Sequence, residues 1–178
     1  MKEIISTSSE LTQQLAYKIG QHIPPGAILI LSGELGAGKT TFAQGLAKGL
    51  GVSEQVTSPT FMVAQTYHSG RLPFSHLDAY RLENADIYGQ GLDEYWQEDA
   101  VTLIEWGEIL APILPESAVF ISLFYQQDNF PEAFGDNLPH DEGLKTEELK
   151  TEKMEDARRI VFHIGNCSWL EEVLNCIS

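Results

Sequence analysis

Residues 33–40 read GELGAGKT and match the phosphate-binding pattern G-x-x-x-x-G-K-[ST] at every fixed position. Glycines in such a loop allow consecutive backbone N–H groups to curl around phosphate oxygens at the start of the next helix, where the helix dipole favours negative charge. Lys39 is expected to reach the β- and γ-phosphates, and the Thr40 hydroxyl to ligate Mg²⁺. A plain glycine-rich turn that caps a helix is the alternative, but an apolar run precedes the motif and an amphipathic pattern follows it. The motif therefore predicts a site for a magnesium-bound nucleotide.

A nucleotide site of this kind generally needs a carboxylate at the end of a neighbouring strand to hold the metal. Glu105 follows a continuous apolar run, which suits a central strand, whereas Asp78 ends the less apolar run FSHLD, which suits a strand nearer an edge. A solvated carboxylate at a strand end is the alternative for either residue. The presence of both acids suggests a division of labour, with one for the metal and the other for the attacking water or the loop.

His76 lies two residues before Asp78, a spacing that places both side chains on the same face of a strand. We expect only a supporting role for it, because a lone histidine is more often structural than catalytic. Residues 57–61, TSPTF, occupy the position where a switch loop commonly senses a γ-phosphate. A polar turn set by Pro59 is an equally good interpretation of that segment, and the two stay open.

The elements that must position these residues alternate between strands and helices. Short apolar runs predict strands at residues 2–6, 27–32, 61–67, 72–78, 101–106, 118–125 and 158–164. The Ser69-Gly70 pair predicts a hairpin turn between the third and fourth of these. Such an order is typical of an α/β protein, here a single P-loop NTPase domain with a mostly parallel central sheet, a β-hairpin and flanking helices.

Two helices are predicted from capping patterns and apolar spacing. Thr7 and Glu10 form a T-x-x-E capping box that would open a helix through residues 11–21. Residues repeating every four positions give each helix an apolar face: Leu11, Leu15 and Ile19 in the first, and Phe42, Leu46 and Leu50 in the second. Residues 91–99, GLDEYWQED, form a further polar, helix-like stretch.

The charge of the chain is strongly negative and unevenly distributed. Its 178 residues include 26 Asp and Glu against 11 Lys and Arg, a formal net charge of −15. Residues 128–156 hold ten acidic residues and three lysines, so about −7 of the charge lies there and about −8 in the rest. We expect the chain to be one domain, residues 1–178, in which 128–156 is an acidic loop insertion before the last strand, either disordered or functional.

Several classes of protein are disfavoured by composition. No run of about 18 apolar residues and no apolar N-terminal segment is present, so we expect neither a membrane span nor a secretory signal, and a cytoplasmic location by default. Cys167 and Cys176 are too small a set for a disulfide scaffold or a four-ligand zinc site, so we expect ordinary reduced thiols. The acidity argues against a protein that grips nucleic acid by itself, but not against a partner that does so.

Four separated segments together resemble the bacterial TsaE (YjeE) family, the ATPase component of tRNA N6-threonylcarbamoyladenosine biosynthesis. They are GELGAGKTTFAQGLAKGLG, SPTF, HLDAYR and LIEW, and the resemblance extends over residues 3–125. The final strand, residues 158–164, would complete the domain, whereas residues 128–156 do not match the compact family members.

The resemblance implies a Mg²⁺-dependent ATPase, weak without partners, that supports threonylcarbamoyl transfer to N6 of adenosine 37 in tRNAs reading codons that begin with A. It implies TsaB and TsaD as partners, with tRNA engaged indirectly through them. The implied nucleotide contacts are Gly36, Ala37, Gly38, Lys39, Thr40 and Thr41, with Thr12 near the base. Thr40 and Glu105 would hold Mg²⁺, and Lys39, Asp78 and Glu105 would serve hydrolysis, with Trp106 following Glu105 as the family pattern expects.

Three other functions compete with this interpretation. A P-loop small-molecule kinase usually places arginines on a lid, but the four arginines here, Arg71, Arg81, Arg158 and Arg159, form no evident lid. A GTPase typically carries an N-K-x-D signature, which the chain lacks, and its D-x-x-G match at residues 86–89 follows no apolar strand. A nucleotide-binding assembly factor without turnover stays open.

Overall fold

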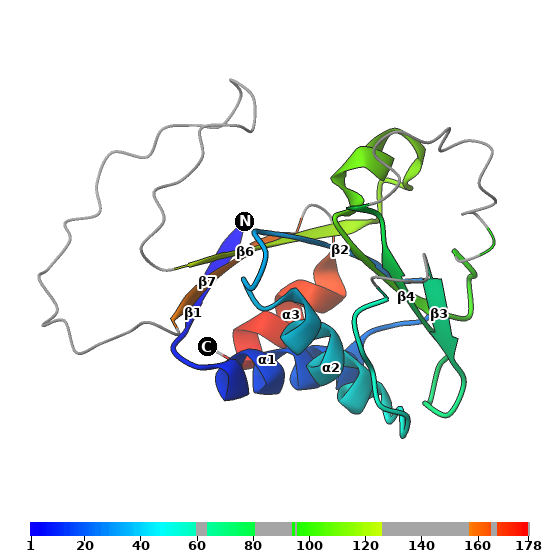
Figure 1. The fold of residues 1–178 in the computed structure, drawn as a ribbon, viewed down its shortest axis with the longest axis horizontal. Coiled ribbons are helices and arrows are strands. Elements are labelled where there is room, and N and C mark those ends of the chain that lie inside the picture. The colour runs from blue at the N-terminus through cyan, green and yellow to red at the C-terminus, as the bar shows by residue number, and fades with distance from the viewer. Residues whose placement is uncertain (60–63, 81–93, 95, 126–156, 165–166, 178) are drawn as a thin grey trace, which may run out of the picture.

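Seven strands in the described part of the chain form one sheet in the order β1-β7-β6-β2-β5-β4-β3 (Figure 1). The computed structural model describes residues 1–59, 64–80, 94, 96–125, 157–164 and 167–177. The strands are β1 (Lys2–Ser6), β2 (Ile28–Ser32), β3 (Ala64–Tyr67), β4 (Phe74–Asp78), β5 (Val101–Glu105), β6 (Val119–Tyr125) and β7 (Arg158–His163). The helices are α1 (Ser9–His22), α2 (Lys39–Leu50) and α3 (Ser168–Ile177), and residues Gly107–Ile113 form a 3₁₀ segment.

Most of the strands run in one direction. β2 pairs in parallel with β5 and β6, and β4 pairs in parallel with β5. β7 is antiparallel to both β6 and β1, and β3 is antiparallel to β4, so only β7 and β3 oppose the other five. The predicted α/β class, the mostly parallel sheet and the β3–β4 hairpin are confirmed. The carboxyl ends of β2, β4 and β5 consequently meet at one edge of the sheet, where ligands of open α/β sheets usually bind.

Two layers of apolar side chains enclose the sheet. The helices α1, α2 and α3 lie together on one face of it, and the 3₁₀ segment lies on the other face (Figure 1). Along β2, Leu29 and Leu31 pack in the helix-side core, whereas Ile28 and Ile30 pack on the opposite side with Leu110. This alternation follows from the period of two in a strand, and it explains why β2 reads as a continuous apolar run.

The start of α1 differs from the predicted capping box. The N-cap is Ser8 and not Thr7, because the Ser8 Oγ accepts a hydrogen bond from the Leu11 N–H at 3.2 Å. The third helical position is then Leu11, which has no side-chain acceptor to complete a reciprocal box. The buried face of α1 also differs from the prediction: Leu11, predicted to be buried, is 45% exposed, whereas Thr12 is 1% exposed. The other predicted apolar positions of α1 and α2 are buried.

Helices α1 and α2 pack unusually close, through glycines. A Cβ atom at Gly45 would clash with the Gln13 carbonyl oxygen, and one at Gly49 would clash with the Tyr17 carbonyl oxygen. The close packing fixes the helix that follows the glycine-rich loop against the first helix. It therefore helps to position the start of α2, where the phosphate motif lies.

Some sequence predictions lie wholly or partly outside the described residues. These are the acidic segment 128–156, the D-x-x-G match at 86–89, part of the helix-like stretch 91–99, the end of the TSPTF segment and the start of the strand predicted at 61–67. The amphipathic helix α3 was not predicted from the sequence, although it contributes Leu170 and Leu174 to the core. None of the helices among the described residues has the length and apolar character needed to cross a bilayer.

Candidate nucleotide site

The glycine-rich loop connects β2 to α2 with backbone angles that its glycines allow. Gly33, Gly36 and Gly38 all have positive φ angles, of 137°, 80° and 107°. At Gly33 a Cβ atom would also clash with the Leu123 carbonyl oxygen, so only glycine fits there. Gly38 is the N-cap of α2 and supplies no capping side chain, which leaves the first N–H groups of the helix facing outward for an anion.

Lys39 is folded back onto the loop that precedes it. Its Nζ donates hydrogen bonds to the carbonyl oxygens of Gly33 at 2.7 Å and Glu34 at 2.9 Å, and lies 4.0 Å from the centroid of the Trp106 ring. The residue is only 5% exposed. Burial lowers the pKa of Lys39 from its ordinary value, and the nearby carboxylates of Glu105, Glu108 and Asp78 act in the opposite direction. A buried cation at a helix N-terminus is well suited to bind phosphate oxygens.

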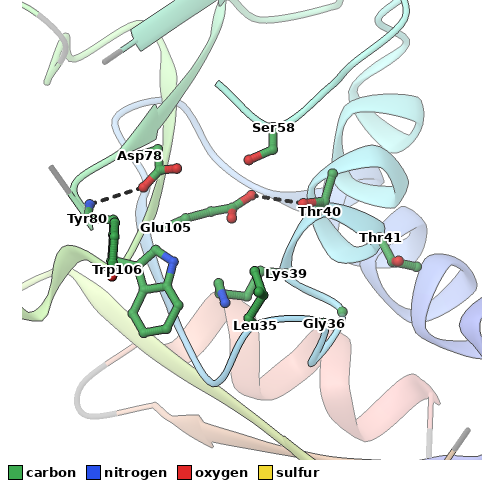
Figure 2. Close-up of a pocket in the computed structure, with 11 residues that line it drawn as sticks. Leu35, Gly36, Lys39, Thr40, Thr41, Ser58, Asp78, Tyr80, Glu105 and Trp106 are labelled. Atoms are coloured by element: carbon green, nitrogen blue, oxygen red, sulfur yellow. Dashed lines mark hydrogen bonds between the residues drawn. The ribbon is translucent and has the colours of Figure 1, made fainter. Parts of the chain in front are cut away.

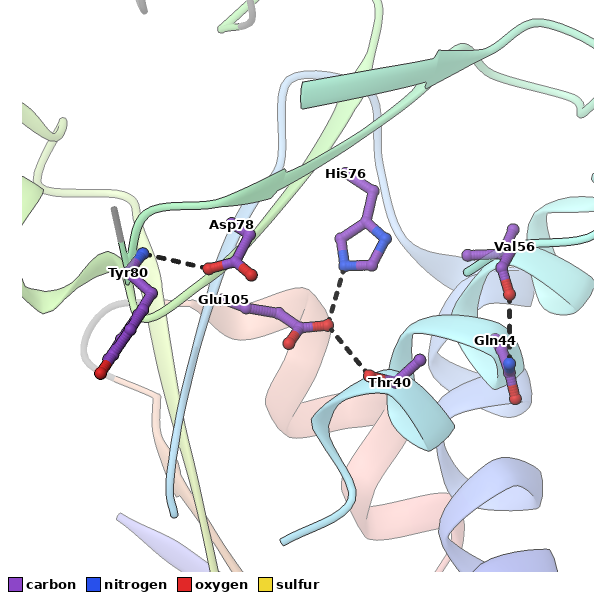
Figure 3. Close-up of polar contacts among 7 residues, drawn as sticks. All are labelled: Thr40, Gln44, Val56, His76, Asp78, Tyr80 and Glu105. Carbon is purple, nitrogen blue, oxygen red and sulfur yellow. Dashed lines mark hydrogen bonds and ion pairs between the residues drawn. The ribbon is translucent and has the colours of Figure 1, made fainter. Parts of the chain in front are cut away.

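The two predicted carboxylates lie side by side at the ends of neighbouring strands. Asp78 and Glu105 are directly paired in the register of β4 and β5. The Glu105 Oε1 lies 3.0 Å from the His76 Nε2 and 3.5 Å from the Thr40 Oγ1 (Figure 3). The Asp78 Oδ1 instead accepts the Tyr80 backbone N–H at 3.0 Å. Thr40 and Glu105, predicted together as metal ligands, are therefore brought into contact.

A pocket of about 530 Å³ opens at this edge of the sheet (Figure 2). The residues that line it come from the glycine-rich loop, α2, the segment before β3, and the ends of β4 and β5: Leu35, Gly36, Gly38, Lys39, Thr40, Thr41, Ser58, Asp78, Tyr80, Glu105 and Trp106. Most of the predicted site residues thus converge on one cavity. Ala37 is fully buried beneath the loop and does not line it.

A second, smaller pocket of about 120 Å³ lies beside the first. Gly36, Gly38 and Thr41 line both pockets. Thr12, predicted near the base, lines the smaller pocket with Ser9 and Arg158, and the Thr12 Oγ1 lies 2.8 Å from the Ser6 Oγ. The two pockets therefore form neighbouring compartments along the same loop.

The donor set suits magnesium better than a softer metal. Mg²⁺ prefers oxygen ligands and usually binds proteins through one or two carboxylates, with substrate phosphates and waters completing the coordination. Thr40 and Glu105 supply a hydroxyl and a carboxylate in contact, with Asp78 and Ser58 on the same pocket. No cluster of three or more His, Cys, Asp or Glu side chains able to hold a metal occurs among the described residues. The residues present fit a metal that arrives with a nucleotide, and not a preformed protein-only metal centre.

Three residues of the site were not assigned a role from their own sequence signals. Trp106 has a φ of 58°, in the left-handed region, and its backbone N–H donates to the Leu31 carbonyl. In this backbone position its ring lies over the Lys39 Nζ. Tyr80 packs against Trp106, with ring centroids 5.4 Å apart. Arg158 stacks on Tyr125 with its Cζ 4.2 Å from the ring centroid. Only long-range pairing of β7 with β6 brings Arg158 near the loop, so no local pattern could have found it.

The fold and this constellation define a P-loop nucleotide-binding α/β domain. A sequence model of the family described as threonylcarbamoyl adenosine biosynthesis protein TsaE matches residues 6–132. The chain belongs to the TsaE family.

Named relatives and a solved structure agree with this assignment. The chain is 36% identical to the tRNA threonylcarbamoyladenosine biosynthesis protein TsaE of Nostoc sp., over 75% of this chain and 84% of that protein. It is 43% identical to TsaE of Treponema pallidum, over 67% of this chain and 88% of that protein. The crystal structure of YdiB from Bacillus subtilis superimposes with a TM-score of 0.71 at 28% identity, covering 99% of this chain and 96% of that one.

Proposed function

We propose that this protein is a Mg²⁺-dependent ATPase that supports threonylcarbamoyl transfer to N6 of adenosine 37 in tRNAs reading A-starting codons. The observation that carries the proposal is the single pocket in which Lys39, Thr40 and Glu105 meet at the glycine-rich loop. Membership of the TsaE family supports the pathway, and the loop geometry supports the nucleotide. TsaB and TsaD are the proposed partners, in the cytoplasm, with tRNA bound through the complex because the chain itself carries a net charge of −15.

In the proposed reaction, Lys39 binds the β- and γ-phosphates in place of the carbonyls of Gly33 and Glu34 that it contacts now. The N–H groups at the start of α2 hold the remaining phosphate oxygens. Thr40 and Glu105 would hold Mg²⁺, which when bound neutralises negative charge that builds up on the phosphates. Asp78, which lines the same pocket as Lys39, would orient or deprotonate the attacking water.

The smaller pocket would take the other end of the nucleotide. Thr12 and Arg158 line it, and it shares three loop residues with the phosphate pocket. Arg158 is therefore proposed as a nucleotide contact, in addition to Thr12. Its stacking on Tyr125, whose hydroxyl donates to the Leu35 carbonyl at 3.2 Å, would link nucleotide binding to the loop.

The proposal is tested by phosphate release from ATP and from GTP, with and without TsaB and TsaD. We expect slow release from ATP alone, a clear change with the partners, and a preference for ATP over GTP. Transfer of phosphate to a small molecule without release would favour a kinase, and nucleotide binding without turnover in any combination would favour an assembly factor. Depletion in cells should remove the modification at tRNA adenosine 37, measured by mass spectrometry, and its retention would contradict the pathway.

We further propose that residues 128–156 are an insertion that the nucleotide site does not need. Replacing them with a short glycine-serine linker should leave the MgATP dissociation constant within about 2-fold, since every residue that lines the two pockets at the glycine-rich loop lies outside 128–156. Isothermal titration of both proteins with MgATP measures this. A large loss of affinity would show that the acidic segment is part of the nucleotide-binding domain.

A further inference from the structure

His76 lies in the middle of β4, and its imidazole is fully buried. Its Nε2 lies 3.0 Å from the Glu105 Oε1 (Figure 3). An ionised carboxylate only accepts hydrogen bonds, so with Glu105 ionised this contact requires a proton on Nε2, which then acts as the hydrogen-bond donor. The other ring nitrogen, Nδ1, is buried and has no hydrogen-bond partner among the described residues. A buried nitrogen without a partner is unusual in a protein core, and the contact between Nε2 and Glu105 is the one hydrogen bond of this imidazole among the described residues.

The strand register explains why the Glu105 carboxylate is directed toward His76. Asp78 lies directly opposite Glu105 on neighbouring strands, which run about 4.8 Å apart in the hydrogen-bonding direction. Like charges on directly opposed residues repel each other. The two carboxylates avoid this by binding in different directions: Asp78 accepts the Tyr80 N–H beyond the end of β4, whereas Glu105 accepts from His76, two residues back along β4.

The same hydrogen bond determines which Glu105 oxygen is left for a ligand. Oε1 is shared between His76, at 3.0 Å, and the Thr40 hydroxyl, at 3.5 Å, so His76 makes the closer contact. Oε2 makes no hydrogen bond with the described residues and would be available to a metal ion or a metal-bound water. We propose that His76 is a positioning residue for Glu105. The Nε2–H of His76 fixes the Glu105 carboxylate in the orientation that magnesium coordination with Thr40 needs. This role rests on the proposed function of the site.

Two isosteric replacements separate positioning from packing. The side-chain amide of glutamine reaches the place of the histidine Nε2, whereas that of asparagine reaches only the place of Nδ1. The probe is the non-hydrolysable ATP analogue AMP-PNP, whose binding is measured by calorimetry in EDTA and over a Mg²⁺ titration. We expect His76→Gln to keep the half-saturating Mg²⁺ concentration within about 3-fold of wild type and His76→Asn to raise it about 10-fold, as loss of groups that orient metal ligands does. The affinity for AMP-PNP in EDTA should be unchanged in both variants.

Ser75→Ala is the matched control, because Ser75 precedes His76 on the other face of β4 and its Oγ lies near the Thr66 Oγ1. It should leave the Mg²⁺ response unchanged. If His76 only fills the core, His76→Gln and His76→Asn will change melting temperature but not the Mg²⁺ response, and the proposal is overturned. If wild type binds AMP-PNP equally well in Mg²⁺ and in EDTA, the proposed function fails as well; if wild type and His76→Asn respond equally to Mg²⁺, only the positioning role fails.

A measurement on the wild-type protein covers the case in which His76→Asn does not fold. NMR of the protein labelled with ¹⁵N-histidine reports which ring nitrogen of His76 carries the proton. We expect the Nε2–H tautomer both in the free protein and with Mg²⁺ and AMP-PNP bound. The Nδ1–H tautomer in the loaded protein would mean that the hydrogen bond to Glu105 is absent when the metal is held, which would overturn the proposal.

Discussion

Two pockets of nearly equal size lie at opposite ends of β2, and both adjoin the N-terminus of a helix. The pocket at the carboxyl end, about 530 Å³, adjoins α2, and the pocket at the amino end, about 560 Å³, adjoins α3 and is lined by Pro24, Pro25 and Trp169 among others. The first gathers Lys39, Asp78 and Glu105. The lining of the second includes one carboxylate, from Glu116, and no lysine or arginine among the described residues. Neither volume nor a helix N-terminus therefore distinguishes a nucleotide site, whereas converging charges on a glycine-rich loop do.

Among substitutions in the two pockets, we expect Lys39→Ala to have the largest effect on ATP hydrolysis. Lys39→Ala removes the buried cation that would bind the transferred phosphate, so ATP hydrolysis should fall by about 1,000-fold or more, as loss of a charge that stabilises phosphoryl transfer does. Phosphate release in the presence of TsaB and TsaD measures this. Lys48→Ala, at the far end of α2, is the control for lost charge on the same helix. If Lys39→Ala and Lys48→Ala lowered ATP hydrolysis equally, the charge of Lys39 in the pocket would not be what distinguishes the carboxyl end of β2.

Asp78 offers a test that separates hydrolysis from binding. Asp78→Asn keeps an oxygen that can accept the Tyr80 N–H, so the strand end should stay in place. Turnover should fall by about 100-fold if Asp78 acts on the attacking water, a typical loss for a general base. The MgATP dissociation constant should change by less than about 3-fold, because the proposed metal ligands, Thr40 and Glu105, are untouched. A loss of binding that matches the loss of turnover would instead assign Asp78 to the metal.

The sequence predicted the mostly parallel sheet and most residues of the pocket beside the glycine-rich loop, but not the long-range contacts that join them. The motif at residues 33–40 and the apolar run before Glu105 are local patterns, so their positions followed from spacing alone. The capping box was wrong by one residue because Thr7, Ser8 and Ser9 are all residue types that can cap a helix, so the local sequence does not distinguish Ser8 from its neighbours. The contacts of Arg158 and the bond from His76 to Glu105 depend on strand order and register, which no single segment encodes.

Arg158 tests whether the smaller pocket beside the glycine-rich loop also binds the nucleotide. Arg158→Gln should weaken ATP binding by about 10-fold, since a charge-assisted hydrogen bond contributes about 1.5–3 kcal/mol. Arg159→Gln is the matched control, because successive residues of β7 point to opposite faces of the sheet, and it removes the same charge. Calorimetric titration with ATP distinguishes the two. If both variants bind ATP equally well, the smaller pocket does not hold the nucleotide.

The smallest effect is expected at the amino end of β2. Glu116→Gln removes the carboxylate from the pocket beside α3, and Ser168→Ala removes a hydroxyl at the start of that helix. Neither change should alter ATP affinity by more than about 2-fold, because both residues line the pocket at the amino end of β2 and neither lines the pocket beside the glycine-rich loop. Competition of inorganic phosphate with ATP should likewise be lost in Lys39→Ala and kept in both of these variants. A phosphate site that survived Lys39→Ala but responded to Ser168→Ala would place an anion at α3, and the helix N-terminus alone would then be enough.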